Sequence, residues 1–318
     1  MSLSEKVSKS LERLKAFEPP EGYYLAFSGG KDSVVCKHLM EMAGVKYDAT
    51  YRVTSVDPPE LVRFIKEQHP DVIREIPRYS LDTKDEKLRG KPVTMWNLIP
   101  KKMMPPTRYG RFCCEYLKES GGDGRMTVTG VRWAESTNRM ANQGIATIYK
   151  KNRTIIDELA ENVDFSRTNR GGVVLTNDNE ASRRMVEQCY KRSKVTLNPI
   201  IDWSDSEVWE FIKAERIPYC SLYEEGFHRL GCIGCPMAKK KGRLRDFARW
   251  PKYKAAYLRA FDKMLEVRRE RNRPFKIGGQ LYPDATARDV FNWWMEFGIM
   301  PNQISFDDIE EEYDVIST

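Results

Sequence analysis

The strongest constraint on the fold is a short apolar run, 23–27, that ends directly in the polar loop 28–33, with the sequence SGGKDS. Apolar runs of this length bounded by glycines are typical of buried strands. Residues 33–43 follow with apolar side chains at helical spacing, so the sequence predicts a strand, a tight loop and a helix in succession. Such a loop brings backbone N–H groups to the positive end of a helix dipole, which favours a bound phosphate.

The side chains of the loop add to this chemistry. Lys31 contributes a full positive charge, and Ser28 and Ser33 contribute hydroxyl donors. Asp32 would repel a bare phosphate, so we expect it to cap the helix or to bind Mg²⁺. The loop matches neither the Walker A pattern nor the dinucleotide pattern G-x-G-x-x-G. The alternative is an ordinary turn with solvated charges, which the coincidence of strand, loop and helix disfavours.

Strands that alternate with helices predict a doubly wound α/β fold with a parallel sheet. The further predicted elements are helices at 3–17, 59–68 and 205–214 and strands at 47–53, 71–76 and 126–131. We expect Ser204 to cap the helix at 205–214. The predicted sections are an N-terminal helix (1–20), a nucleotide-binding domain (21–238) with a weakly patterned insertion at about 140–195, and a basic helical C-terminal region (239–318).

Composition narrows the class of protein. The chain has 318 residues, 41% of them hydrophobic and 31% charged, which argues against intrinsic disorder. No run approaches the ~18 apolar residues of a membrane helix, and residues 1–10 lack the apolar core of a signal peptide. We therefore expect a cytoplasmic protein with no membrane contact. Seven cysteines are too few for a disulfide scaffold, and their clustering favours metal or redox chemistry.

Four of these cysteines form two close pairs. Cys113 and Cys114 are adjacent, and Cys232 and Cys235 form a CxxC more than a hundred residues later. Four thiolates hold either zinc or an iron–sulfur cluster. Adjacent thiolates reach one ion with difficulty, whereas each can bind a different iron of a cluster, so the spacing favours a cluster. Zinc and buried thiols remain the alternatives.

The loop SGGKDS after the first strand resembles the signature of the PP-loop ATP pyrophosphatases, the adenine nucleotide alpha-hydrolase superfamily, whose members cleave ATP to AMP and pyrophosphate. The cysteine spacing resembles the iron–sulfur branch of the phosphoadenylyl-sulfate (PAPS) reductase family, in which such cysteines hold a 4Fe–4S cluster beside the nucleotide. Residues 56–60 (VDPPE) are similar to the second nucleotide-side loop of that family. Residues 130–139 (GVRWAESTNR) are similar to its substrate-facing segment, and 198–203 (NPIIDW) to its stretch before the CxxC.

The resemblance implies a Rossmann-like sheet that binds ATP and Mg²⁺. The implied nucleotide-binding residues are Ser28, Gly29, Gly30, Lys31, Asp32, Ser33, Asp57 and Gly130. The implied catalytic residues are Lys31, Asp32, Arg132 and Arg139, and the two arginines would balance charge on phosphate or sulfate. The implied ligands of the 4Fe–4S cluster are Cys113, Cys114, Cys232 and Cys235.

Two departures from the family bear on the reaction. Its sulfonucleotide reductases carry a catalytic cysteine in a C-terminal Glu-Cys-Gly-x-His segment, whereas this sequence has no cysteine after Cys235. Reductases also usually have a degraded PP-loop, whereas this one is intact. We therefore expect an ATP pyrophosphatase that adenylates a substrate in sulfur transfer, closest in character to the DNA phosphorothioation protein DndC. A sulfur donor such as a cysteine desulfurase is then an implied partner.

Two alternatives remain open. The first is a phosphoadenylyl-sulfate or adenylyl-sulfate reductase, in which Cys220 would be the substitute nucleophile. The second is a nucleic-acid-binding subunit of a modification complex. Residues 239–276 carry fifteen Lys/Arg and four Asp/Glu, which favours binding to a phosphate backbone. The aromatic residues in this tract have helical spacing, so we expect them to pack in the core rather than stack on bases. A homodimer is left open.

Overall fold

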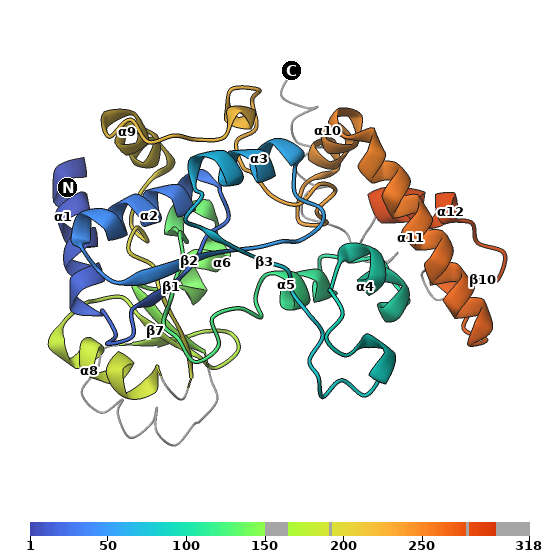
Figure 1. Cartoon of the computed structure of the whole chain (residues 1–318), viewed down its shortest axis with the longest axis horizontal. Helices are drawn as coiled ribbons and strands as arrows, with labels where there is room; N and C mark the ends of the chain where they lie inside the picture. Colours follow the sequence, from blue (N-terminus) through green and yellow to red (C-terminus); the bar gives the residue numbers. More distant parts are fainter. Residues whose placement is uncertain (150–164, 191–192, 278–279, 297–318) are drawn as a thin grey trace, which may run out of the picture. The chain divides into compact units, whose positions relative to one another are not determined.

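The computed structural model describes residues 1–149, 165–190, 193–277 and 280–296 (Figure 1). They form two compact units, each assembled from segments that are separate in sequence. Unit 1 comprises Met1–Arg52, Pro59–Glu75 and Ser120–Leu230, and unit 2 comprises Val53–Pro58, Ile76–Glu119 and the described residues from Gly231 onward. The predicted sections follow one another along the chain, whereas the units interleave, because the chain enters unit 2 after two strands of unit 1.

Unit 1 is built on an eight-stranded sheet of order β3-β2-β1-β4-β8-β5-β7-β6. Its strands are β1 (Tyr23–Ala26), β2 (Tyr47–Arg52), β3 (Ile73–Glu75), β4 (Thr127–Val128), β5 (Ala146–Tyr149), β6 (Ser166–Arg167), β7 (Val173–Leu175) and β8 (Lys194–Leu197). The neighbours from β3 to β8 pair in parallel, which confirms the predicted α/β fold. Strands β5, β7 and β6 extend the sheet with antiparallel pairing.

The antiparallel extension falls in the section predicted as a weakly patterned insertion. Strands β5 to β7 each have only two to four residues, so period-two alternation has little length in which to show. Helix α8 (Glu180–Cys189) belongs to the same section, and its Val186 is fully buried. Residues 150–164 and 191–192 of this section lie outside the described residues.

The helices predicted at 3–17, 33–43, 59–68 and 205–214 are confirmed, and a further short helix at 137–142 was not predicted. The helices are α1 (Leu3–Ala16), α2 (Lys31–Ala43), α3 (Pro59–Gln68), α6 (Thr137–Asn142) and α9 (Asp205–Ala214), with short 3₁₀ turns η2 (Trp133–Glu135) and η4 (Ser221–Tyr223). Ser204 caps α9, because its hydroxyl accepts the Glu207 N–H. Helix α2 packs between α1 and α9, which fixes the helix that carries the predicted phosphate loop.

Unit 2 is mainly helical. Its helices are α4 (Met95–Lys102), α5 (Phe112–Leu117), α10 (Lys240–Arg249), α11 (Pro251–Glu270) and α12 (Ala287–Glu296), with a 3₁₀ turn η1 (Glu86–Leu88) and a hairpin of β9 (Phe275–Ile277) and β10 (Gln280–Tyr282). Helix α11 packs against α4 and α12. Tyr257, Phe261 and Trp294 meet in the fully buried centre of this unit, which confirms the predicted core role of Tyr257 and Phe261, whereas Tyr253 is half-buried. Among the described residues, every helix is too short or too polar to span a lipid bilayer.

Candidate functional site

The loop 28–33 connects the carboxyl end of β1 to the amino end of α2. Strand β1 has β2 on one side and β4 on the other, so the order of the sheet reverses beside this loop. Open α/β sheets bind ligands at such a switch point, outside the carboxyl ends of the strands. The predicted phosphate loop therefore lies where this architecture places a ligand.

Two glycines allow close packing around the loop. Gly29 has a φ of +73°, and a Cβ there would lie 2.8 Å from side-chain carbons of Leu61 and Ile65. Gly130 follows β4, and a Cβ there would lie 2.8 Å from the backbone carbon of Asp32. Only glycine fits these two approaches, which explains why both positions carry it.

The loop presents hydroxyl and amide groups at the start of α2. The hydroxyls of Ser28 and Ser33 lie 3.1 Å apart, and the Ser33 hydroxyl is 2.9 Å from the Gly30 carbonyl oxygen. Gly30 caps α2 without a side-chain hydrogen bond. The Lys31 N–H donates to the hydroxyl of Tyr223 over 2.8 Å, so a tyrosine from η4 lies against the loop. Sequence patterns alone did not indicate Tyr223.

A network of charges supports the loop from within unit 1. Arg132 is 2% exposed, and its Nε donates to Asp32 over 2.8 Å and its Nη2 to Asp205 over 2.9 Å. Its Nη1 lies 3.3 Å from the carbonyl oxygen of Trp203. The Lys31 ammonium lies 3.0 Å from the Asp205 carboxylate. All three nitrogen atoms of Arg132 are thus engaged, which makes it a positioning residue for two carboxylates.

Asp205 is a site residue that the sequence analysis missed, because an acid in the first turn of a helix is explained by capping alone. Burial opposes ionisation of its carboxyl group, but Lys31 and Arg132 outweigh burial and lower the pKa of Asp205. Burial also acts against the charge of Arg132, and Asp32 and Asp205 outweigh it and raise the pKa of Arg132. The positive charges of Lys31 and Arg132 and the negative charge of Asp205 therefore stabilise one another beside the loop.

Two other predicted site residues lie in different units, Arg139 in unit 1 and Asp57 in unit 2. Arg139 lies in unit 1, where it pairs with Glu135 at 2.5 Å. Burial lowers the pKa of Arg139, and the neighbouring positive charge of Arg229 lowers it further. Arg229 is exposed and was not indicated by the sequence analysis. Asp57 lies in unit 2, where its Oδ1 is 3.8 Å from the sulfur of Cys232.

The four predicted cysteine ligands all lie in unit 2. Cys113 and Cys114 occupy the first turn of α5, and the 232–235 segment forms a turn in which the Cys235 N–H donates to the Cys232 carbonyl. Gly234 has a φ of +70°, and a Cβ there would lie 2.4 Å from the ring of Phe247. The hydroxyl of Tyr257 donates to the Ile233 carbonyl over 3.1 Å. Helices α10 and α11 thus hold the turn in place.

The thiol of Cys113 interacts electrostatically with those of the other three cysteines. A hydrogen bond from Cys113 and the adjacent Arg111 lower the pKa of Cys114 to about 5. The hydrogen bond to Cys114 raises the pKa of Cys113, and the charges of Cys232 and Cys235 also contribute. Burial raises the pKa of Cys232 to about 12. Among Cys113, Cys114 and Cys232, Cys114 is therefore the thiol that loses its proton most readily.

The four cysteines are candidate ligands for two kinds of metal centre, a single zinc ion and a 4Fe–4S cluster. Within the described residues, no group of three or more His, Cys, Asp or Glu side chains is placed to hold a metal ion. A single zinc ion needs its ligands to converge at about 2.3 Å, whereas the thiolates of a 4Fe–4S cluster bind different irons. The negative charge of Cys232 raises the pKa of Lys118. The Lys118 ammonium supplies positive charge beside the thiols. The residues fit an anionic cluster better than a single ion.

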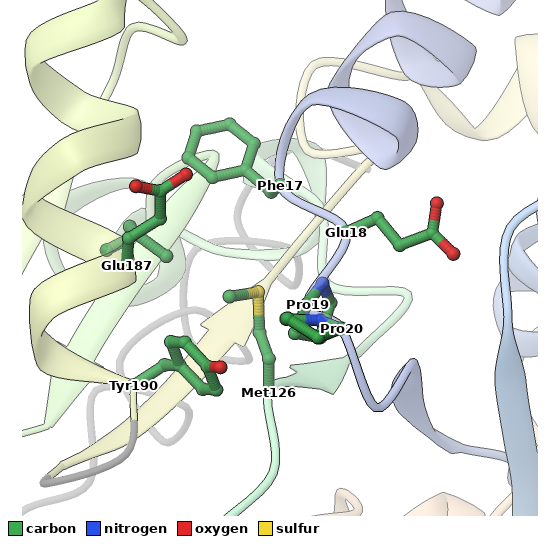
Figure 2. A pocket seen from close by; sticks show the side chains of 8 residues that line it. Phe17, Glu18, Pro19, Pro20, Met126, Glu187 and Tyr190 are labelled. Atoms are coloured by element: carbon green, nitrogen blue, oxygen red, sulfur yellow. The ribbon is translucent and has the colours of Figure 1, made fainter.

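A cavity of about 370 Å³ lies elsewhere in unit 1 (Figure 2). It is lined by Phe17, Glu18, Pro19, Pro20, Met126, Val186, Glu187 and Tyr190. Pro20 precedes β1 and Met126 precedes β4, so the cavity opens at the amino ends of these strands. The phosphate loop follows the carboxyl end of β1, and the cavity contains no residue of the predicted site.

Comparison with known proteins gives matches over most of the chain. An uncharacterized protein of Methanocaldococcus jannaschii is 25% identical over 264 residues, which cover 80% of this chain and 43% of that protein. The chain thus spans less than half the length of this relative. An adenosine 5'-phosphosulfate reductase of Bacillus thuringiensis is 20% identical over 71% of this chain and 77% of its own length. One of Neisseria meningitidis is 43% identical over 53 residues, 17% of this chain and 22% of that protein.

Among solved structures, a phosphoadenylyl-sulfate reductase of Candida auris aligns with 72% of this chain and 93% of its own. The TM-score is 0.38 and the identity 13%, a similarity too weak to support an inference. The model of the phosphoadenosine phosphosulfate reductase domain matches residues 22–238, about two thirds of the chain. The match includes the phosphate loop, the Arg132 network and all four cysteines of unit 2. The chain therefore belongs to the phosphoadenosine phosphosulfate reductase domain family.

Proposed function

We propose that the chain is an adenine-nucleotide enzyme that binds ATP at the loop 28–33 and carries a 4Fe–4S cluster on the four cysteines of unit 2. The observation that carries the nucleotide half is the position of the loop at the switch point between β1 and β4. There its glycine backbone, Lys31 and the start of α2 offer several donors to a polyphosphate.

The proposed reaction is adenylation. An oxygen atom of the acceptor attacks the α-phosphorus of ATP, the bond to the pyrophosphate oxygen breaks, and pyrophosphate leaves with the electron pair of that bond. Lys31 stabilises the negative charge on the leaving group, and the backbone N–H groups hold it. Asp32 would hold Mg²⁺, which supplies further neutralisation of phosphate charge. Arg132 keeps Asp32 and Asp205 in position.

The thiols outside the cluster favour adenylation over sulfonucleotide reduction. Covalent reduction needs a reactive thiolate that attacks the substrate sulfur. Among the described residues, the three other cysteines, Cys36, Cys189 and Cys220, are at most 2% exposed. Burial raises the pKa of Cys36 and of Cys220, so neither is a good nucleophile near neutral pH.

The cluster completes the proposal for sulfur transfer. Cys113, Cys114, Cys232 and Cys235 would hold it, and it supplies a site where a sulfur-bearing group is bound or reduced. The outer sulfur of a persulfide on a donor of the cysteine desulfurase class would then attack the adenylated atom of the acceptor, and AMP would leave with the electron pair of the broken bond to oxygen. A thiol reductant would supply the two electrons that cleave the resulting disulfide and release the sulfurated acceptor. Names of relatives as adenosine 5'-phosphosulfate reductases support the alternative, reduction of a sulfonucleotide.

The deciding experiment uses the anaerobically purified chain. Calorimetry should show tighter binding of ATP than of PAPS, and Lys31→Ala should weaken ATP binding by about 1.5–3 kcal/mol, the range for hydrogen bonds to charged groups. The exposed Lys46 is the matched control, and Lys46→Ala should bind ATP like the unchanged protein. With Mg²⁺, ATP and acceptor, the products should be AMP and pyrophosphate. A preference for PAPS together with thioredoxin-dependent sulfite release would overturn adenylation in favour of reduction.

A second candidate function, binding of nucleic acid, has its own observation. Of the fifteen basic residues in 239–276, thirteen are exposed: Lys239, Lys240, Lys241, Arg245, Arg249, Lys252, Lys254, Arg259, Lys263, Arg269, Arg271, Arg273 and Lys276. The neighbouring aromatic residues Phe247, Trp250, Tyr257 and Phe261 are buried. The surface therefore offers charge without stacking platforms, which favours contact with the phosphate backbone.

This candidate predicts binding governed by salt. Fluorescence anisotropy with a labelled DNA or RNA duplex should give an affinity that falls steeply between 50 and 200 mM salt and varies little with base sequence (roughly tenfold per decade of salt for each phosphate neutralised). Replacing Lys252, Arg259 and Lys263 together by Gln should reduce the salt slope. Affinity for an acidic protein but not for nucleic acid would contradict it.

A further inference from the structure

A buried arginine of unit 2, Arg243, has donors without partners. Arg243 is 4% exposed, its Nη1 donates to the Trp294 carbonyl over 2.7 Å, and its guanidinium carbon lies 4.0 Å from the centre of the Trp294 ring. Its Nε and Nη2 are also buried, and neither has a hydrogen-bond partner among the described residues. Buried donors are nearly always paired in folded proteins, so this arginine lacks an acceptor.

The position of Arg243 connects it to the turn that carries Cys232 and Cys235. Helix α10 begins just after the turn, and the Ala238 N–H before it donates to the Cys235 carbonyl. Arg243 and Phe247 are four residues apart on α10 and so share one face. The Phe247 ring contacts Gly234 inside the turn, and the charge of Arg243 interacts with the thiol of Cys235.

The nearby groups do not supply a counter-charge at contact distance. No carboxylate of the described residues forms an ion pair with Arg243, and the nearby Asp246 accepts the Gly234 N–H over 3.2 Å. Burial lowers the pKa of Arg243 to about 10; Tyr257, Cys235 and Asp246 act in the opposite direction, and Arg108 adds to the lowering. A buried cation of this kind requires a nearby anion to be stable.

We infer that Arg243 is the counter-charge of the cluster, with its Nε–H and Nη2–H groups donating to sulfide of the cluster. A 4Fe–4S cluster on four thiolates is a net anion, so it supplies the acceptor and the negative charge that Arg243 lacks. Arg243 is a positioning residue in this assignment, since it acts through the cluster and touches no substrate. The inference rests on the cluster half of the proposed function and is independent of the choice of nucleotide.

This assignment has a consequence for the electronic state of the cluster. A cation and hydrogen bonds at the sulfur atoms stabilise the more negative, reduced form, which raises the reduction potential. Arg243→Met keeps much of the side-chain length but removes the charge and the donors. Arg243→Lys keeps the charge with fewer donors in a different geometry. Arg288→Met, at an exposed position of α12 in the same unit, is the matched control.

The test is a redox titration of anaerobically reconstituted full-length protein, monitored by electron paramagnetic resonance, with iron and sulfide content measured in parallel. We expect a more negative potential and faster iron loss to a chelator for Arg243→Met, a smaller shift for Arg243→Lys, and no change for Arg288→Met. Should Arg243→Met not fold, Arg243→Lys decides alone.

The outcomes separate this role from the cluster itself. An Arg243 variant with the potential and the iron-release rate of the unchanged protein would overturn the counter-charge role and leave the cluster in place. An unchanged protein that takes up no iron and sulfide would overturn the proposed cluster, and with it the role of Arg243. A merely structural arginine would alter folding without shifting the potential, so the titration distinguishes the two.

Discussion

At the scale of single residues, the buried side chain of His69 affects how the stability of the protein depends on pH. His69 is 7% exposed and lies between the rings of Phe27 and Phe64, with ring centres 4.9 and 5.2 Å away. Its Nε2 is buried without a hydrogen-bond partner among the described residues. Burial lowers the pKa of His69, Lys37 adds to this, and the acids Asp71 and Glu41 act in the opposite direction.

We therefore expect His69 to lower the free energy of unfolding of the protein in acid. Because its pKa is lower in the folded state, the unfolded chain binds the proton first, so stability should fall as the pH drops below about 6.5 and level off below the folded pKa. Urea unfolding of the unchanged protein and of His69→Phe between pH 5 and 8 measures this contribution as a difference. Parallel pH profiles for the two proteins would contradict it.

Replacement of Arg132 should have a larger effect on the free energy of unfolding at neutral pH. Arg132→Met leaves the carboxylates of Asp32 and Asp205 with the ammonium of Lys31 as the cation of their network. Breaking a fully buried pair costs about 3–5 kcal/mol, and the partial exposure of both carboxylates reduces our expectation to about 1–3 kcal/mol. Denaturant unfolding checks the value, and Arg74→Met at an exposed position should stay within about 0.5 kcal/mol of the unchanged protein.

The residues of the phosphate loop and Arg132 could be predicted as site residues from the sequence, whereas their contacts could not. The helices and β1 were predictable because their apolar residues repeat with a clear period. Arg132 was expected to face substrate, whereas it contacts Asp32 and Asp205, and contacts over so long a sequence separation leave no local pattern. Asp57 was expected at the nucleotide loop and lies in unit 2, because the chain changes units directly after β2.

At the scale of elements, the chain after β4 packs closely against the phosphate loop. A Cβ at Gly130 would lie 2.8 Å from backbone and side-chain carbons of Asp32, and backbone cannot move aside as a flexible side chain can. The same contact holds the start of α2 against the carboxyl end of the sheet. Disturbing it should therefore affect both stability and nucleotide binding.

Gly130→Ala should destabilise the protein by about 1–3 kcal/mol, the usual cost of overpacking, and should weaken ATP binding. Gly242→Ala is the control, because Gly242 lies in α10 and a Cβ there meets only the Ala238 Cβ at 3.7 Å. This second change should stabilise the helix by about 0.5–1 kcal/mol, since alanine forms helix more readily than glycine. Effects of the same sign for both variants would refute the argument from close contact.

At the scale of the whole molecule, the two predicted chemistries occupy different units. The phosphate loop and its charge network are built from unit 1, and all four cysteines from unit 2. Cluster ligands that come from separate segments of the chain hold those segments together, so binding free energy becomes folding free energy. Removal of the cluster should then affect the units unequally.

We expect iron removal by an anaerobic chelator to increase hydrogen exchange in 76–119 and 231–277 and to leave β1, β2 and α2 protected. Mass spectrometry of peptides from loaded and stripped protein measures both regions in one experiment. The Cys232→Ser variant should show the exchange of the stripped protein. Equal loss of protection in both units would show that the thiols do not stabilise unit 2 separately.

The interleaving of the two units also governs how this chain is made. Cys232 emerges from the ribosome 118 residues after Cys114, so at roughly 5–20 residues per second the first thiol pair waits about 6–24 s for the second. Unit 1 likewise cannot complete its sheet until β8 has been synthesised. During that interval the thiols of Cys113 and Cys114 lack the second pair and are open to oxidation. Cells short of reductant should therefore lose this protein during its synthesis rather than after it has folded.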